Sequence, residues 1–320
     1  MNVVTTLPSA TEVVAALEIE PVGVSHECDY PPDVTSVPVV TSSRIDSDAS
    51  SAEIDRQVLE AAADDGPGVY DVDRETLESL DPDLIVTQGI CDVCAVDEVV
   101  IERAVTEIDA DPEILATDPH TIGDVLEDVR RVGRATGRED RAESVVDDLE
   151  SRIETVRARA AVADDRPRVA IFDWTEPAMI AGHWMPELVE AAGGEYGMAD
   201  PADRSRPREW EAVREYDPEV IVVAPCGFGL EQTAANLTDL TDREGWDDLA
   251  AVREGRVWAM DGHHYVNRPG PRLVDTLEAL APIVHPDPDL FEDPPESIAR
   301  PLADLETLEG ADRRGRLESQ

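Results

Sequence analysis

Four cysteines and one histidine occupy positions from which they could bind a metal or form a redox pair. Cys91 and Cys94 have the Cys-x-x-Cys spacing of metal and redox sites, and His26 with Cys28 could complete a set of four ligands. Cys226 follows another apolar run, so all four thiols are expected at the carboxyl ends of strands. Three interpretations stay open: free or structural thiols, contacts to a transition metal or to the metal of a ligand, and a redox pair.

Aromatic residues are scarce, with five tryptophans, five tyrosines and three phenylalanines, so their positions are informative. Six of them fall in loops, most within a few residues of a predicted strand's carboxyl end: Tyr30, Trp174, Trp184, Trp210, Phe228 and Tyr265. Aromatic side chains at such loops suit a large flat ligand that is buried by stacking. The alternative is that they complete the core of their own lobe.

Two further polar groups could contact a ligand. His263 and His264 lie close to Asp261 and could bind a metal or occupy an axial position, although histidine pairs at a surface are commonly inert. Arg268 follows the last predicted strand and could hold an anionic or amide-bearing ligand, or pair with an acid of the chain itself. The sequence contains no phosphate-binding glycine motif and no G-x-S-x-G, and no nucleophile–base or acid pair is evident. We therefore expect a binding protein and not an enzyme.

The elements that position these groups begin at the amino terminus. An apolar run over 3–7 predicts a strand, the spacing of Ser9 and Glu12 predicts a capping box, and the stretch 10–18 has helical period. A second apolar run over 22–25 completes a β-α-β unit. Such a unit predicts a parallel sheet whose ligands lie beyond the carboxyl ends of its strands.

The rest of the chain continues this alternation. Further strands are expected near 38–41, 84–88, 168–173, 220–225 and 256–260, and further helices near 52–63, 97–109, 185–193, 210–216 and 272–281. Residues 121–163 carry no strand signal and predict two helices with a break at Gly137. We expect an amino-terminal α/β lobe over 1–119, a connecting helix over 120–165, a carboxyl-terminal α/β lobe over 166–286 and an acidic, proline-rich tail over 287–320.

The two predicted lobes share an internal similarity. Residues 75–86 (ETLESLDPDLIV) match residues 211–222 (EAVREYDPEVIV), and each segment predicts a helix, an Asp-Pro stop and a buried strand. Two similar Rossmann-like lobes joined by a long rigid helix would enclose a ligand cleft between them.

The charge of the chain excludes some partners. Seventy-two acidic and 27 basic residues give a net charge of −45, and no residue is a lysine. A chain this acidic repels nucleic acid, and it resembles the proteins of salt-accumulating halophiles, in which molar salt screens charge over about 3 Å. No apolar run reaches the length of a membrane span, and no export signal precedes the first strand. We expect a cytosolic product, or an exported lipoprotein if the true start lies upstream.

Three amino-terminal segments resemble the opening of the vitamin B12 (cobalamin) binding proteins of ABC importers: Leu7–Glu12 (LPSATE), Val22–Ser25 (VGVS) and Asp29–Pro32 (DYPP). These proteins belong to the helical-backbone (class III) substrate-binding family, which also carries siderophores and haem. The resemblance runs from residue 3 to about 285. The elements around His26, Cys28, Cys91 and Cys94 are similar to a cysteine-bearing, haloarchaeal-type branch of that family.

The resemblance implies two Rossmann-like lobes that grip a corrin ring. The ligand contacts that we expect are Ser9, Tyr30, Gln88, Trp174, Trp184, Trp210, Phe228, His264, Tyr265 and Arg268. Glu75 and Glu211 are similar to the two glutamates that dock the lobes on a permease, and the alternative is that both are ordinary exposed helix-start residues.

The leading hypothesis is therefore a monomeric cobalamin or corrinoid binder that needs no cofactor. A histidine or cysteine could approach the cobalt. One alternative keeps the fold and exchanges the ligand for haem or a ferric siderophore. Another is a cytosolic thiol- or metal-dependent protein that handles corrinoids through Cys91 and Cys94.

Overall fold

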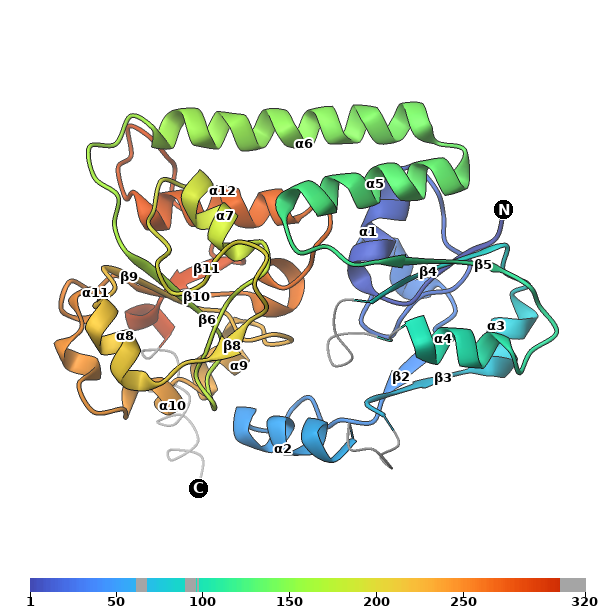
Figure 1. Ribbon diagram of the computed structural model, residues 1–320, viewed down its shortest axis with the longest axis horizontal. Coiled ribbons are helices and arrows are strands. Elements are labelled where there is room, and N and C mark those ends of the chain that lie inside the picture. The colour runs from blue at the N-terminus through green and yellow to red at the C-terminus, as the bar shows by residue number, and fades with distance from the viewer. Residues whose placement is uncertain (62–67, 90–95, 97, 306–320) are drawn as a thin grey trace, which may run out of the picture. The chain divides into compact units, whose positions relative to one another are not determined.

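A computed structural model gives the fold and describes residues 1–61, 68–89, 96 and 98–305. The chain forms two compact units (Figure 1). Unit 1 contains Met1–Ala49, Glu53–Ser151 and Arg268–Arg272, whereas unit 2 contains Ser50–Ala52, Arg152–Asn267 and the chain from Leu273 onward. Both units combine strands with covering helices, which confirms the predicted α/β fold with two lobes.

Unit 1 is built on a parallel sheet of strand order β1–β4–β5. Its strands are β1 (Val3–Thr5), β4 (Leu84–Gln88) and β5 (Glu113–Thr117), and an antiparallel pair is formed by β2 (Thr41–Ser43) and β3 (Tyr70–Val72). The helices are α1 (Pro8–Ala16), η1 (Pro32–Ser36, a 3₁₀ helix), α2 (Ser51–Ala61, whose first two residues belong to unit 2), α3 (Arg74–Ser79), α4 (Glu98–Val105) and α5 (Ile122–Thr136). Helix α5 covers one face of the sheet and α4 the other (Figure 1).

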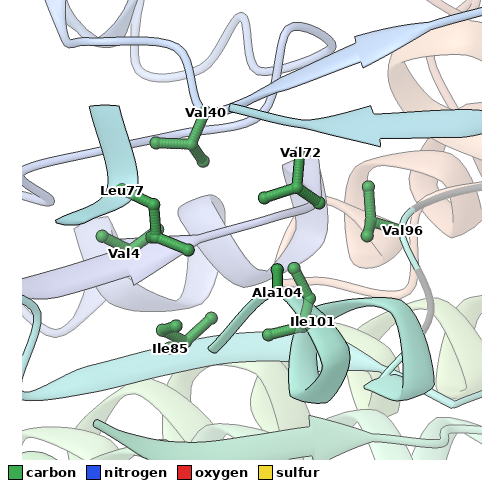
Figure 2. Packing of buried hydrophobic residues seen from close by; sticks show 8 residues of the cluster. All are labelled: Val4, Val40, Val72, Leu77, Ile85, Val96, Ile101 and Ala104. Atoms are coloured by element: carbon green, nitrogen blue, oxygen red, sulfur yellow. The ribbon is translucent and has the colours of Figure 1, made fainter. Parts of the chain in front are cut away.

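The core of unit 1 consists of small branched side chains. Figure 2 shows eight of them packed together: Val4, Val40, Val72, Leu77, Ile85, Val96, Ile101 and Ala104. The central strand β4 begins with three apolar residues that are fully buried, as expected for a parallel strand covered on both faces. Each such valine, leucine or isoleucine contributes roughly 1.5–3 kcal/mol when it leaves water. The core thereby holds the carboxyl ends of the strands in fixed places.

Unit 2 is built on a six-stranded sheet of order β11–β10–β9–β6–β7–β8, in which β10, β9 and β6 run parallel. Its strands are β6 (Val169–Trp174), β7 (Met179–Ile180), β8 (Arg206–Pro207), β9 (Val220–Val223), β10 (Val257–Met260) and β11 (Ala299–Pro301). Its helices are α7 (Met185–Ala191), α8 (Trp210–Tyr216), α9 (Leu230–Ala235), α10 (Thr238–Thr241), α11 (Ala250–Arg253) and α12 (Leu273–Val284), with the 3₁₀ helix η2 (Trp246–Asp248) and the π-helical turn η3 (Gly262–Val266).

The two helices predicted between the lobes are α5 and α6 (Glu139–Ala160). Thr121 and Asp124 form the capping box of α5, and Gly137 ends it in a left-handed conformation with φ of 66°. Glycine adopts this conformation at little cost, which explains why the helix breaks there. The division between the units falls inside α6, after Ser151. No helix within the described ranges is long and apolar enough to cross a bilayer.

Three expectations need correction. The capping box at Ser9 and Glu12 is wrong, because Leu7 caps α1 without a side-chain hydrogen bond. Residues 22–25 form no strand; Gly23 and Val24 make only isolated parallel bridges. The segment expected to be a tail instead supplies β11, which pairs antiparallel with β10, and Phe291, Ile298, Leu302 and Leu305 are buried.

The internal repeat appears as matching backbone geometry in the two units. Helix α3 precedes β4 in unit 1, and helix α8 precedes β9 in unit 2. Asp81 and Asp217, which precede the prolines of the repeat, both have a φ of 46°. Aspartate tolerates this left-handed region better than most residues, so the same residue ends both helices.

Strand β5 ends the three-stranded sheet of unit 1. The Thr117 carbonyl accepts a hydrogen bond from Gly89, which follows β4, so the preceding carbonyl of Ala116 faces the opposite, outer edge. Arg131 of α5 donates to that outer Ala116 oxygen at 2.8 Å and pairs with Asp128 at 2.7 Å. An arginine side chain therefore occupies the outer edge of β5.

Candidate ligand-binding site

The carboxyl ends of β6 and β9 in unit 2 bring two of the predicted aromatic residues together. Trp174 is the last residue of β6, and Phe228 lies in the loop after β9. Their ring centroids are 5.2 Å apart with the planes tilted by 53°. Phe228 is buried and Trp174 is half-buried, so the pair presents part of an indole at the surface of unit 2. Such a surface can stack against a flat apolar ring.

The π-helical turn η3 lies beside this pair. The backbone amides of Gly262 and His263 both donate to the Phe228 carbonyl at 3.0 Å. A side chain at Gly262 would place its Cβ 2.1 Å from the Pro225 carbonyl oxygen, so only glycine allows the turn to approach the β9 loop this closely. π-Helical turns often occur at functional sites. The turn carries His263, His264 and Tyr265.

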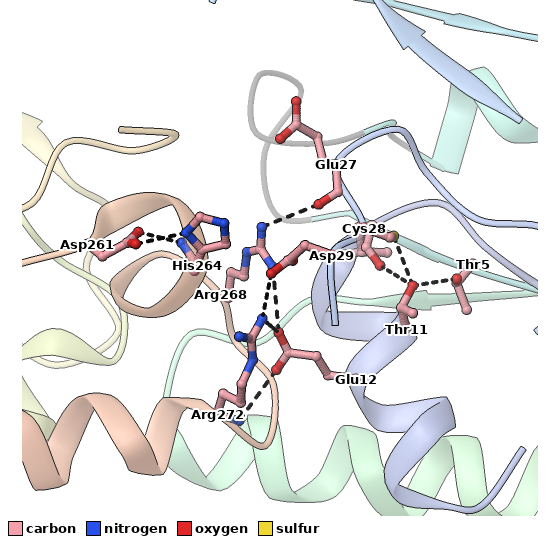
Figure 3. A network of polar contacts seen from close by, with 11 residues as sticks. Thr5, Thr11, Glu12, Glu27, Cys28, Asp29, Asp261, His264, Arg268 and Arg272 are labelled. Carbon is pink, nitrogen blue, oxygen red and sulfur yellow. Dashed lines mark hydrogen bonds and ion pairs between the residues drawn. The ribbon is translucent and has the colours of Figure 1, made fainter. Parts of the chain in front are cut away.

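His264 is fixed by Asp261, the residue that follows β10 (Figure 3). Its backbone amide donates to Asp261 Oδ1 at 2.7 Å, and its Nδ1 donates to Asp261 Oδ2 at 2.8 Å. Asp261 is buried, whereas 36% of the His264 side chain is exposed. The His263 ring meets the His264 ring edge-on at 4.3 Å. The two contacts with Asp261 therefore restrict the side-chain dihedral angles of His264 and also which of its ring nitrogens carries the proton.

The other two tryptophans of the predicted set have partners inside unit 2. Trp184 is buried, and its Nε1 donates to the Val266 carbonyl at 3.1 Å, which ties α7 to the π-helical turn. Trp210 stacks on Trp246 at 6.2 Å, and its Nε1 donates to the Glu244 carbonyl at 2.9 Å. These contacts give both residues a structural role. A direct contact with a ligand stays a prediction for them and for Tyr265.

Asp173 was not anticipated from the sequence, although it immediately precedes Trp174 in β6. Its Oδ1 is buried and accepts no hydrogen bond within the part of the chain that the structure describes. Burial raises the pKa of this carboxyl to about 7, against the opposing effect of the Ser205 hydroxyl. The only signal in the sequence is an acid within an otherwise apolar strand.

Unit 1 contains a cluster of four charged side chains, which are Glu12, Asp29, Arg268 and Arg272 (Figure 3). Arg268 pairs with Asp29 and lies 3.8 Å from Glu12, and only 5% of its side chain is exposed. Arg272 donates to Glu12 Oε1 at 2.7 Å, and its guanidinium lies 4.4 Å from the centre of the Tyr30 ring. Burial raises the pKa of Glu12, and the hydrogen bond from Arg272 opposes this shift.

The charge cluster changes the interpretation of Arg268. Its charge is matched by acids of the chain itself, which was the second of the two possibilities that the sequence left open. Tyr30 remains 44% exposed, so its ring can still meet a ligand. Arg272 was not singled out from the sequence. Its spacing of four residues from Arg268 was the available signal, together with Glu12 in an otherwise apolar helix.

Ser9 and Gln88 are both buried. Gly270 covers Ser9, because a Cβ at Gly270 would lie 3.3 Å from the Cα and Cβ of Ser9. Gln88 is the last residue of β4 and pairs in register with Thr117 of β5. Ligand contacts by these two residues stay predictions.

The predicted metal ligands lie only partly within the described residues. Cys91 and Cys94 are outside them, so the four-ligand set is not tested. The Cys28 sulfur lies 3.0 Å from Thr11 Oγ1, and burial raises the pKa of this thiol to about 11. His26 Nδ1 lies 2.8 Å from Thr41 Oγ1. Across the residues with described positions, no three His, Cys, Asp or Glu side chains are grouped so as to hold a metal ion.

Glu75 and Glu211 occupy equivalent places in the repeat. Each lies in the first turn of its short helix, α3 or α8, and each is exposed. Glu211 pairs with Arg214 at 2.9 Å. These features are compatible with docking and also with ordinary helix-start glutamates, so docking stays a prediction.

One groove in unit 1 is lined by none of the residues that were predicted to contact a ligand. Its volume is about 990 Å³, and it follows the outer side of β5 and the end of α5, with Glu98, Asp118, Arg131 and Arg134 in its lining. Charged walls of both signs do not favour a flat apolar ligand.

Comparison with known proteins places this geometry in a family. Residues 3–263 match the sequence model described as periplasmic binding protein. The chain is 24% identical over 295 residues to the uncharacterized ABC transporter substrate-binding lipoprotein YvrC of Bacillus subtilis (strain 168), covering 89% of this chain and 80% of that protein.

Two solved structures share the fold. One is a periplasmic haem-binding protein from Pseudomonas aeruginosa, with a TM-score of 0.68 and 21% identity, covering 92% of this chain and 95% of that one. The other is the periplasmic vitamin B12 binding protein BtuF of Vibrio cholerae, with a TM-score of 0.63 and 19% identity, covering 88% and 96%. At this identity the likeness shows the fold alone. The family match spans most of both units, and the chain therefore belongs to the periplasmic binding protein family, whose members bind ligands and are not enzymes.

Proposed function

We propose that this protein is the substrate-binding component of an ABC-type uptake system and that its ligand is cobalamin or a related corrinoid. The family membership and the description of the Bacillus subtilis relative support the transport role. The observation that carries the choice of ligand is the Trp174–Phe228 pair beside the π-helical turn. It offers a rigid aromatic surface next to a histidine, which suits a planar ring with a metal at its centre.

Haem is a second candidate, because it is also a flat ring with a central metal, and the Pseudomonas aeruginosa structure is that of a haem-binding protein. A ferric siderophore is less well supported. Anionic siderophores need unpaired positive charge, whereas Arg268 and Arg272 are both matched by Glu12 and Asp29. Because these arginines already pair with acids of the chain, a ligand held by stacking is favoured over one held by ion pairs.

Titration of the purified protein with cyanocobalamin and with hemin, in molar potassium chloride, tests the proposal. All five tryptophans lie in unit 2, so quenching of their fluorescence reports ligand at that unit. Trp174→Ala removes the stacking surface and should weaken binding about 30-fold, equivalent to about 2 kcal/mol. Trp258→Ala is the matched control, since Trp258 is a half-buried tryptophan of strand β10 in the same unit.

The outcomes separate the candidates. Micromolar binding of cyanocobalamin that depends on Trp174 supports the corrinoid. Binding of hemin alone makes the corrinoid assignment wrong and leaves haem as the ligand. Binding of neither ring would refute both and direct attention to siderophores.

Docking on a permease through Glu75 and Glu211 is part of the proposal. Charge reversal, Glu75→Arg with Glu211→Arg, should abolish ligand uptake by cells that depend on this protein while leaving ligand affinity unchanged. Glu215→Arg is the control, because Glu215 is exposed on the same helix as Glu211. Equal uptake by the double variant and the control would contradict docking at these residues.

The proposed location is the extracytoplasmic face of the membrane, supported by the description of the Bacillus subtilis relative as a lipoprotein. The alternative of a cytosolic protein that handles corrinoids depends on Cys91 and Cys94, which lie outside the described residues. Cell fractionation with an antibody against the chain distinguishes these two locations.

A further inference from the structure

Strand β11 lies outside the part of the chain that matches the family model, which ends at residue 263. It pairs antiparallel with β10, the strand that leads into the π-helical turn (Figure 1). Three residue pairs are in register: Met260 with Ala299, Ala259 with Arg300 and Trp258 with Pro301. The carboxyl-terminal segment thus adds a strand directly beside the element that carries the turn.

The pairing continues beyond β10 to the residue from which the turn starts. The Asp261 amide donates to the Ile298 carbonyl at 2.8 Å. Asp261 is buried, so its amide would be costly to leave without an acceptor. The Ile298 carbonyl therefore fixes the backbone at the start of the turn.

From Asp261 the connection reaches the aromatic surface through the turn itself. The next two amides, those of Gly262 and His263, both donate to the Phe228 carbonyl at 3.0 Å. The Phe228 ring in turn lies 5.2 Å from the Trp174 ring, measured between centroids. A shift of Asp261 would move these amides relative to Phe228 and so disturb the ring pair. Strand β11 is thus linked to the stacking surface by backbone hydrogen bonds and one ring contact.

The segment that contains β11 is itself well anchored in unit 2. The Ile298 and Ala299 amides both donate to the Pro295 carbonyl, at 2.8 and 3.0 Å. The buried apolar side chains of the segment are those of Phe291, Ile298, Ala299, Leu302 and Leu305. Burial of these side chains offsets the conformational entropy that the segment loses when it is ordered.

The alternation of an antiparallel pair shows which amide of β11 faces β10. Asp261 and Ile298 form a hydrogen-bonded pair, so the pair two residues along each strand, Ala259 with Arg300, is hydrogen-bonded as well. The Arg300 amide therefore points toward β10. Pro301, which has no amide hydrogen, occupies the next position, where an amide would point away from β10.

We propose that β11 is a positioning element of the ligand site, which keeps the π-helical turn and the loop of Phe228 in the arrangement that presents the aromatic surface. This inference rests on the proposed function, because it takes the Trp174–Phe228 pair as the surface that meets the ligand. When only a fraction of the molecules holds the competent arrangement, the apparent affinity falls by that fraction. Loss of the pairing between β11 and β10 should therefore weaken ligand binding as well as stability.

Replacement of Arg300 by proline in the full chain tests the proposal, because proline removes the amide that faces β10. Arg300→Ala is the matched control. It loses the same side chain, including its hydrogen bond to the Glu296 carbonyl at 2.9 Å, and keeps the amide. Equilibrium dialysis measures the binding of cyanocobalamin and of hemin without relying on the fluorescence of Trp258, which pairs with Pro301. The affinity should fall about tenfold in Arg300→Pro and stay within about twofold of the wild type in Arg300→Ala.

Hydrogen exchange of the Gly262 and His263 amides reports on the turn without any ligand. It should be at least about tenfold faster in Arg300→Pro than in the wild type and in Arg300→Ala. Arg300→Gly is a second variant, which keeps the amide and only loosens the strand. Its affinity should fall about threefold.

A strand with a purely structural role would lower the urea midpoint of Arg300→Pro but leave its ligand affinity and the exchange of the turn unchanged in the absence of urea. That result would overturn the inference and leave the proposed function intact. If the proline variant does not fold, wild-type affinity and exchange in Arg300→Gly would overturn the inference equally. Failure of the wild type to bind either ring would instead overturn the proposed function, and the exchange rates would still decide whether β11 positions the turn.

Discussion

Replacement of Asp173 by asparagine offers a sharp test of the electrostatics of unit 2. Asp173 has a buried oxygen without a hydrogen-bond donor among the described residues, and its pKa is raised from about 3.8 to about 7. The folded protein therefore keeps this carboxyl protonated over a range where the unfolded chain has already released the proton. Its contribution to stability is complete below about pH 4 and is lost as the pH rises through about 7.

The size of the effect follows from the shift. One pKa unit is worth about 1.4 kcal/mol, so the wild-type protein should lose about 2 kcal/mol of unfolding free energy from this group between pH 5 and pH 7. This figure is an upper bound, because the residue as a whole is only half-buried. Asparagine does not titrate, so Asp173→Asn removes the pH-dependent part. If the new asparagine has an amide hydrogen without an acceptor, the unfolding free energy of the variant falls by about 1–3 kcal/mol, and this loss is the same at every pH.

Urea unfolding followed by tryptophan fluorescence measures the effect, because all five tryptophans report unit 2. The quantity to compare is the difference in unfolding free energy between the wild type and Asp173→Asn at pH 5, 6, 7 and 8, in molar potassium chloride. Other titrating groups are common to both proteins and cancel. As the pH rises to about 7, the unfolding free energy of the variant should increase relative to that of the wild type, and above this pH the difference should stay constant. A difference that is constant across this range would refute the assignment of the raised pKa to Asp173.

Three further outcomes are expected. Arg272→Ala should destabilise unit 1 by about 3–5 kcal/mol, because it leaves Glu12 buried without its closest partner; unchanged hydrogen exchange in α1 would contradict this. Gly262→Ala should destabilise unit 2 by about 1–3 kcal/mol through its clash with the backbone of the β9 loop, and an unchanged urea midpoint would argue against that packing. Cys28 should resist iodoacetamide at pH 8 in the folded protein, where about one thiol in a thousand is ionised, and mass spectrometry showing rapid labelling would count against its burial.

Much of the fold could be predicted from periodicity and turn residues. Strong apolar runs such as 84–88 and 220–225 correspond to β4 and β9, and Gly137 marks the break between α5 and α6. The prediction failed where elements are very short. Strands β7 and β8 have two residues each, too few for any period to appear, and their pairing depends on tertiary neighbours.

The site was predicted in part. The sequence correctly predicted that Trp174 and Phe228 lie near the carboxyl ends of strands. Parallel strands have these ends at one edge of the sheet, so the two residues come together there. The sequence did not predict that Glu12 would leave its expected cap and pair with Arg272, since that contact joins residues 260 positions apart. Long-range ion pairs leave no local pattern in the sequence, which is why the pairing of Arg272 with Glu12 could not be predicted.

The arginine at the outer edge of β5 has a consequence for behaviour at high concentration. A bare strand edge offers unpaired carbonyl and amide groups to any extended chain, and this is a common route to aggregation. Arg131 uses the Ala116 oxygen that such a chain would need, and it places a bulky cation where a new strand would have to lie. Crowded copies of this protein should therefore resist joining sheet to sheet at β5, even when salt has removed the mutual repulsion of their acidic surfaces.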